Sequence, residues 1–147
     1  MNKDAIEMQN GFFELSKGKD VCLVSTGYMT HTALKAVSSL KREGIEAGLV
    51  DVFFMKTLDE DLFLNAIKKY RHVVTIEEGF INKGGLDSMV STIIANRKAN
   101  IIMERMGFGD AYVFDIGARD YLHKINRLDE AAIINSVKNI LGTSDEK

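Results

Sequence analysis

The sequence predicts an α/β fold: a three-layer α/β/α sandwich with about five strands, mainly parallel, with a candidate antiparallel strand at one edge. Short apolar runs rich in β-branched residues alternate with longer segments whose apolar residues recur at helical spacing. The central apolar runs are continuous, which is typical of parallel strands buried on both faces. This alternation implies right-handed crossovers, so that helices cover both faces of one sheet.

The first half of the chain begins with two strand–helix units. Residues 20–25 (DVCLVS) form a short apolar run that predicts a buried strand. Residues 30–43 follow with one apolar helical face, and Gly44 is expected to end that helix. The next strand is expected within residues 45–55. A further short strand is expected at residues 12–15, before these units.

The second unit continues into the most distinctive part of the sequence. Thr57 and Glu60 have the spacing of a capping box, which predicts a helix over residues 58–70. A third strand is expected at residues 72–76 (HVVTI), and an apolar stripe predicts a helix over residues 86–97.

Beyond that helix the patterns are shorter. Residues 100–104 favour another strand, and residues 112–116 fit either a short strand or an extended loop. Residues 118–125 favour a short helix. Asp129 is expected to cap a last helix, which ends before Gly142.

Composition limits the classes of function. With 147 residues, 46% of them hydrophobic and 27% charged, the chain fits one globular domain. A net charge of −2 gives no electrostatic reason to expect binding to nucleic acid or an anionic membrane. No apolar run approaches the length of a membrane span, and the first ten residues lack the centre of a secretory signal, so a cytoplasmic location is expected. The single cysteine, Cys22, lies in an apolar strand and is expected to be an unreactive core residue.

Residues 75–90 (TIEEGFINKGGLDSMV) combine adjacent carboxylates with a glycine turn. Neighbouring residues on a strand point to opposite faces, so Glu77 and Glu78 are not expected to share a proton or a substrate. We expect one glutamate to bind backbone N–H groups of the glycine loop and the other to be solvated or to meet a partner. Gly84 and Gly85 suggest positive φ or a close backbone contact that excludes a β-carbon.

No complete active site follows from the remaining residues. Gly27 opens a helix, but a lone glycine matches neither a dinucleotide nor a nucleoside triphosphate loop. The histidines, His31, His72 and His123, lack metal-ligand spacing, so no metal site is expected and each is interpreted as a surface or packing residue. Asp87, in the first turn of its helix, competes with any anion for the helix dipole.

Four blocks in a fixed order carry a resemblance to a known family. They are residues 18–52, residues 54–61 (FMKTLDED), residues 73–90 and residues 115–141. Their order resembles the C-terminal domain of the transketolase family, which includes deoxyxylulose-phosphate synthase and the beta subunits of 2-oxoacid dehydrogenases. Three positions depart from the pattern of that family. Thr57 replaces the usual proline, and Asp87 and Arg127 each replace a usual glycine.

The resemblance implies a supporting role. Relatives place thiamine diphosphate and magnesium between a pyrophosphate-binding and a pyrimidine-binding domain, and the C-terminal domain mainly supports assembly. This chain is therefore expected to bind no cofactor by itself and to carry no catalytic residue, although it would form part of a transferase holoenzyme. Its expected partners are the thiamine-diphosphate-binding domains or subunit, with homodimer contacts in addition. The residues assigned to an interface or structural loop are Gly27, Glu77, Glu78, Gly84 and Gly85.

Several alternatives stay open at this point. Residues 11–142 are expected to form the domain, residues 1–10 a linker or N-terminal tail, and residues 143–147 a frayed tail; an excised fragment and a separate subunit fit equally. The block TGYMTHTAL (residues 26–34) is closer to transketolase, whereas EEG without histidine is closer to the dehydrogenase and deoxyxylulose branches. A regulatory domain that binds a small anion at helix N-termini is the alternative function, and a free-standing carboxylate enzyme is a weaker one.

Overall fold

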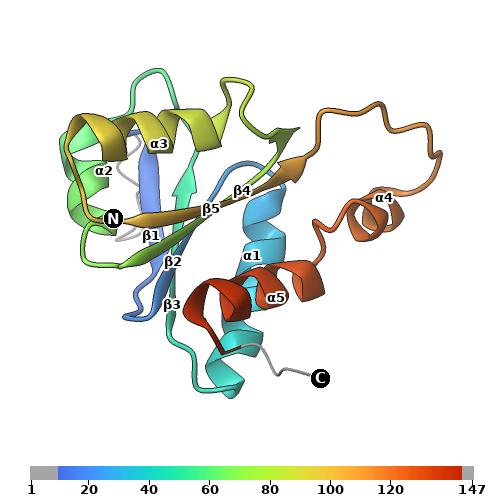
Figure 1. Cartoon of the computed structure of the whole chain (residues 1–147), viewed down its shortest axis with the longest axis horizontal. Helices are drawn as coiled ribbons and strands as arrows, with labels where there is room; N and C mark the ends of the chain where they lie inside the picture. Colours follow the sequence, from blue (N-terminus) through green and yellow to red (C-terminus); the bar gives the residue numbers. More distant parts are fainter. Residues whose placement is uncertain (1–9, 144–147) are drawn as a thin grey trace, which may run out of the picture.

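A computed structural model describes residues 10–143, and in it five strands form a single mixed sheet in the order β1-β3-β2-β4-β5 (Figure 1). The strands are β1 (Phe12–Ser16), β2 (Val21–Ser25), β3 (Ala47–Val52), β4 (His72–Phe80) and β5 (Ile102–Phe108). Edge strand β1 pairs antiparallel with β3, and the other pairs are parallel. The predicted fold class is confirmed.

Helices cover both faces of this sheet. They are α1 (Met29–Arg42), α2 (Glu60–Ile67), α3 (Leu86–Asn96), α4 (Arg119–Ile125) and α5 (Glu130–Leu141). Helices α1 and α5 lie on one face, and α2 and α3 lie on the other (Figure 1). Leu23 of β2 faces α1 and α5, whereas its neighbour Val24 faces α2 and α3. Both side chains are fully buried, which explains why the strand is continuously apolar.

The last two helices are close to expectation. Helix α4 lies within the predicted residues 118–125. Helix α5 begins at its N-cap Asp129, whose carboxylate accepts a hydrogen bond from the Ala132 N–H at 3.0 Å. Gly142 ends this helix with φ of +69°, a left-handed conformation that glycine adopts readily. The expected linker or tail at 1–10 and the frayed tail at 143–147 lie almost wholly outside the described residues, so the domain limits stay a prediction.

The predicted capping box of α2 is wrong. The N-cap is Asp59, whose carboxylate accepts a hydrogen bond from the Leu62 N–H at 3.0 Å, and the helix spans Glu60–Ile67 instead of 58–70. The position of the N-cap is explained by a contact between two residues that are far apart in the sequence. The Asp59 N–H donates to the Asn10 carbonyl at 3.0 Å, which ties the residues before the helix to the start of the domain. Thr57 therefore lies in a turn before the helix.

Strands β4 and β5 extend further than the apolar runs indicate. Strand β4 continues through residues 77–80 instead of ending at residue 76, and β5 spans 102–108 instead of 100–104. Their register shifts between Ile76 and Phe80, where Phe80 pairs with Phe108. This extension depends on pairing between the two strands, which residue polarity does not reveal. Residues 112–116 are an extended loop, one of the two forms expected.

None of the helices within residues 10–143 has both the length and the apolar character needed to cross a membrane.

Candidate functional site

The residues singled out in the sequence gather where the parallel strands end. Gly27 lies in the turn between β2 and α1 with φ of +60°, and a β-carbon there would meet no atom within 4 Å. Glycine is therefore favoured by backbone conformation and not by lack of space. Next to this turn, the Ser25 and Thr30 hydroxyls lie 2.9 Å apart, and the Thr30 hydroxyl donates to the Asp51 carboxylate at 2.7 Å. This chain of polar groups joins the ends of β2 and β3 to the first turn of α1.

Glu77 acts as the cap of α3. Its carboxylate is buried and accepts hydrogen bonds from the Leu86 and Asp87 N–H groups, each at 3.1 Å. These are free donors at the helix N-terminus, where the helix dipole also favours a negative charge. Gly85 precedes the helix and has no side chain that could cap it. A glutamate that lies on the strand thus supplies the anion that this helix end attracts.

The glycines around Glu77 leave room for its carboxylate. A β-carbon at Gly85 would lie 2.4 Å from the Glu77 Oε2 atom, and one at Gly79 would lie 2.7 Å from the same atom. Gly84 is different, because its φ is +87° and the space around it is open. The two expected reasons for adjacent glycines therefore apply to different residues: positive φ at Gly84 and a close contact at Gly85.

Asp87 stabilises the turn that precedes α3. Its carboxylate is fully buried and accepts from the Asn82 N–H at 2.7 Å, the Ser88 N–H at 2.6 Å and the Arg105 guanidinium at 3.1 Å. Burial acts to raise the pKa of Asp87, but the hydrogen bonds from Asn82, Arg105 and Ser88 outweigh it, so the pKa lies below its usual value. The charged form is thus the one that the fold stabilises.

Glu78 points away from this turn and toward α4. Its Oε1 atom lies 2.7 Å from His123 Nε2 and 3.1 Å from Arg119 Nε. The Arg119 guanidinium stacks 4.3 Å from the centre of the Tyr28 ring. We call Tyr28, Glu78, Arg119 and His123 the α4 anchor. This anchor joins the β2–α1 turn, the end of β4 and a helix that lies beyond the sheet (Figure 1).

The sequence identifies only part of this cluster. His123 is buried with 4% of its surface exposed, and His31 is exposed at the start of α1. Glu78 and His123 are 45 residues apart, and no short motif links them. The one feature of the sequence that could have indicated the role of His123 is its position. It is an isolated histidine on a short helix, after a loop without regular apolar spacing. A packing role for His123 is one of the two roles expected of it, but its contact with Glu78 does not follow from the sequence.

Replacing His123 with alanine is expected to loosen α4. Amide exchange within residues 119–125 should accelerate by about tenfold, since opening this helix would no longer break the contact with Glu78. Hydrogen–deuterium exchange measures the effect. Lys35→Ala is the control, because Lys35 is an exposed residue of α1 outside the anchor, and its replacement should leave exchange in α4 unchanged. Equal protection of α4 in both variants would contradict the anchor.

The arrangement does not form a catalytic carboxylate pair. Glu77 binds the N-terminus of α3 and Glu78 binds residues of α4, so the two carboxylates serve different elements. Burial raises the pKa of the Cys22 thiol, which makes it a poor nucleophile at neutral pH. Among residues 10–143, no group of three or more His, Cys, Asp or Glu side chains is placed to hold a metal ion.

Comparison with known proteins identifies the family. Residues 13–133 match the sequence model described as the C-terminal domain of transketolase. The chain belongs to the transketolase C-terminal domain family. The 1-deoxy-D-xylulose-5-phosphate synthase of Halothermothrix orenii is 33% identical over 128 residues, which are 86% of this chain and 20% of that enzyme. One of the subunits of the apulose-4-phosphate transketolase of Actinobacillus succinogenes is 32% identical over 121 residues, 82% of this chain and 39% of that relative.

Solved structures agree with this family. A split-gene transketolase, described as an inactive β4 tetramer, superposes with a TM-score of 0.83 at 29% identity, covering 97% of this chain and 46% of that one. The transketolase of Campylobacter jejuni superposes with a TM-score of 0.67 at 13% identity, covering 95% of this chain and 20% of that one, and shows the shared fold. This transketolase C-terminal domain thus spans about a fifth to two fifths of the curated relatives that it matches.

Proposed function

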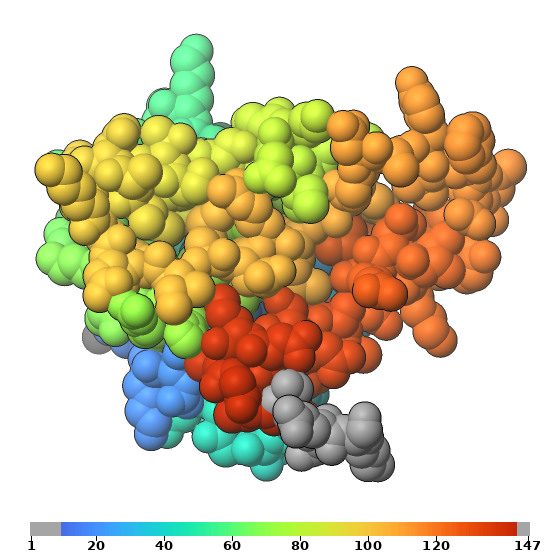
Figure 2. Space-filling model, viewed as in Figure 1, coloured from blue at the N-terminus to red at the C-terminus, as the bar shows by residue number. Residues whose placement is uncertain are grey.

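We propose that this chain is the C-terminal domain or subunit of a transketolase-like enzyme that depends on thiamine diphosphate, and that it serves assembly with the other domains. The observation that carries the proposal is an exposed apolar segment at residues 109–118, between β5 and α4. Tyr112, Phe114 and Ile116 are 89%, 85% and 98% exposed. The segment projects from the body of the domain (Figure 2). Apolar side chains gathered in this way are typical of a surface that another protein surface covers.

The position of the segment supports an interface with neighbouring domains. It leads directly into α4, which the α4 anchor fixes at the end of the sheet where the parallel strands terminate. The relatives are two and a half to five times longer than the part that this chain matches. Further domains are therefore available in such proteins to cover an apolar surface at this end. The expected interface role of Gly27, Glu77, Glu78, Gly84 and Gly85 is then to shape the adjoining loops.

The N-terminus of α3 does not fit the diphosphate group of thiamine diphosphate. A diphosphate would need free N–H groups at a helix N-terminus, and at α3 the Glu77 carboxylate already binds the N–H groups of Leu86 and Asp87. A negative side chain in that position would also repel the diphosphate. The same contact disfavours the alternative of a regulatory domain that binds a small anion at this helix. We propose that the cofactor is bound by partner domains or a partner subunit.

The reaction is part of the same proposal. The relatives named above include a deoxyxylulose-phosphate synthase and a transketolase subunit, and we propose transfer chemistry of the transketolase type for the holoenzyme. The proposal includes homodimer contacts and a cytoplasmic location, as the sequence led us to expect.

A direct test uses the chain with a transketolase-like partner that carries the pyrophosphate- and pyrimidine-binding domains. Phe114→Ser combined with Ile116→Ser should weaken binding to that partner by at least about tenfold, because both side chains would be buried in the interface. Analytical ultracentrifugation measures the complex. Leu62→Ser, at a 45% exposed apolar residue of α2, is the control and should bind as the unmodified chain does.

Calorimetry with thiamine diphosphate and magnesium completes the test. The chain alone should show no stoichiometric binding. Tight binding by the chain alone would contradict the assembly role, and equal weakening by the Leu62 variant would contradict the assignment of the interface to residues 109–118.

A further inference from the structure

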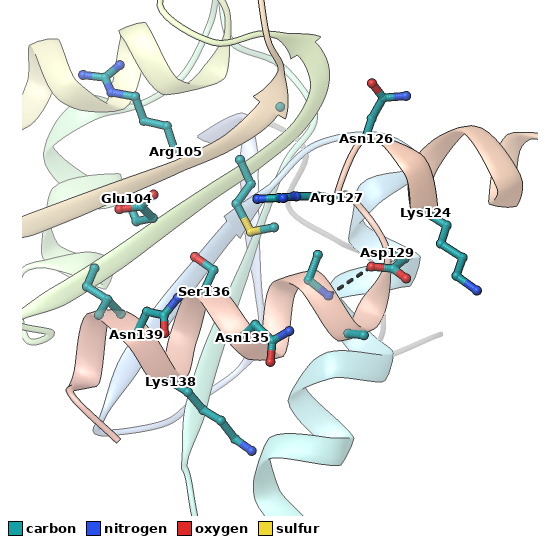
Figure 3. A pocket seen from close by; sticks show the side chains of 15 residues that line it. Glu104, Arg105, Lys124, Asn126, Arg127, Asp129, Asn135, Ser136, Lys138 and Asn139 are labelled. Atoms are coloured by element: carbon teal, nitrogen blue, oxygen red, sulfur yellow. Dashed lines mark hydrogen bonds between the residues drawn. The ribbon is translucent and has the colours of Figure 1, made fainter. Parts of the chain in front are cut away.

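A second surface lies away from the α4 anchor and the apolar segment. An open groove of about 1120 Å³ runs between the outer edge of β5 and helix α5, and the connection from α4 to α5 closes one end (Figure 3). It is lined by polar and charged side chains more than by apolar ones. The proposed function gives this groove no role.

One wall of the groove is a strand edge that pairs with no further strand within residues 10–143. Strand β5 is the last in the sheet. The Ile102 N–H donates to the Arg71 carbonyl at 2.8 Å, and the Phe108 carbonyl accepts from the Ile81 N–H at 3.0 Å, so the even-numbered residues of β5 bond toward β4. In a parallel ladder the alternate residues then direct their N–H and C=O groups outward. These residues are Met103, Arg105 and Gly107.

Basic residues outnumber acidic ones in the lining of the groove, although the whole chain has a net charge of −2. The basic residues that line it are Arg105, Lys124, Arg127 and Lys138, and the acidic ones are Glu104 and Asp129. Several of these groups are already engaged: Asp129 caps α5, Arg105 pairs with Asp87, and Lys138 pairs with Glu43. Within residues 10–143, the charged lining residues without such a partner are Lys124, Arg127 and Glu104. With two unpaired cations against one carboxylate, an occupant with negative charge near Lys124 and Arg127 is favoured over a neutral or a basic one.

Arg127 is the residue most specifically placed for such an occupant. Its side chain extends from the α4–α5 connection into the space between β5 and α5 (Figure 3). Within residues 10–143 its guanidinium has no ion-pair partner. Its φ of +57° belongs to the C-terminal cap of α4, where the Arg127 N–H donates to the Lys124 carbonyl at 3.2 Å and the Leu128 N–H donates to the His123 carbonyl at 2.8 Å. A guanidinium that has no ion-pair partner and extends into a groove is a candidate for binding an anionic group.

We propose that this groove binds an extended acidic segment of a partner protein, which adds to the outer edge of β5 as a further strand. Backbone groups of Met103, Arg105 and Gly107 would pair with the segment, and carboxylates of the segment would meet Arg127 and Lys124. A second copy of this chain fits less well. Pairing two β5 edges about a two-fold axis would bring two identical basic grooves together.

A labelled peptide of alternating Glu and Val, its charge-reversed Lys and Val counterpart, and the acidic peptide with N-methylated backbone amides test this proposal. Fluorescence anisotropy with the whole chain should show binding of the acidic peptide alone. Arg127→Gly should weaken that binding by about fivefold, the range of one accessible charge pair. This variant also relieves the left-handed backbone, so loss of folding would not explain the effect.

Lys98→Gly is the matched control. Lys98 is also a cation with positive φ, at +51°, but it does not line the groove, and its replacement should leave peptide affinity unchanged. Equal binding of the charge-reversed or the N-methylated peptide would overturn the proposal. Equal effects of the two glycine variants, or no binding of the acidic peptide, would also overturn it. The same holds if the groove prefers an oligonucleotide to the acidic peptide, or if the chain self-associates and Arg127→Gly abolishes that self-association.

Discussion

Glu77→Ala is expected to lower the free energy of unfolding by about 3 kcal/mol, because it leaves two buried N–H donors without an acceptor. The Leu86 and Asp87 N–H groups both depend on this carboxylate. The change also removes a negative charge from the N-terminus of α3. Urea denaturation followed by circular dichroism measures the loss. The local effect of the substitution on α3 should appear as faster amide hydrogen exchange in the first turn of this helix.

Glu78→Ala is the matched control on the next residue. Its side chain is 34% exposed and contacts Arg119 and His123 of α4, so its removal should cost about 1 kcal/mol or less. A double-mutant cycle with Gly85→Ala adds a second criterion. The alanine β-carbon would lie 2.4 Å from Glu77 Oε2, so Gly85→Ala should destabilise the unmodified chain strongly and the Glu77→Ala variant much less. Additive effects at these two residues would contradict the close contact.

The different roles of the two glutamates could be predicted from the sequence because they follow from local geometry. Adjacent residues on a strand face opposite sides, whatever their partners are. The identity of the partners required the fold. The Leu86 and Asp87 N–H groups in the first turn of α3 lie nine and ten residues beyond Glu77. A contact this short in sequence can be expected between the end of a strand and the helix that follows it. His123 lies 45 residues beyond Glu78, and only the path of the loop after β5 brings it there.

The same distinction explains the errors in element limits. Both Thr57 and Asp59 are acceptable N-cap residues, and a propensity argument cannot choose between them. The choice is made by the contact between the Asp59 N–H and the Asn10 carbonyl, which is nearly fifty residues away in sequence. Strand β5 is likewise extended by its pairing with β4, up to Phe108. Continuous apolar runs predicted the buried centre of the sheet well. Helices cover both faces of the central strands, so successive residues along such a strand are buried and apolar.

Gly48→Ala is expected to cost about 3 kcal/mol, the upper range for overpacking a well-filled core. A β-carbon at Gly48 would lie 2.2 Å from the Tyr70 hydroxyl oxygen and 2.7 Å from its ring carbon Cζ. Tyr70 is fully buried, and its hydroxyl accepts a hydrogen bond from the Gly18 N–H at 3.0 Å. A shift of the buried ring away from the new β-carbon would strain that bond. Urea denaturation should therefore show a lower midpoint.

Gly44→Ala is the control that distinguishes two causes of destabilisation: a steric clash of the new β-carbon and an unfavourable backbone conformation. Gly44 has φ of +82° and open space at the β-carbon position, so alanine there should cost only about 1 kcal/mol. In a Tyr70→Leu background the ring is absent, and Gly48→Ala should then cost about 1 kcal/mol or less. An undiminished cost of Gly48→Ala in that background would show that the strand itself requires glycine. The reduction expected here instead assigns the requirement to the contact between β3 and the Tyr70 ring, whose hydroxyl also binds the Gly18 N–H in the connection between β1 and β2.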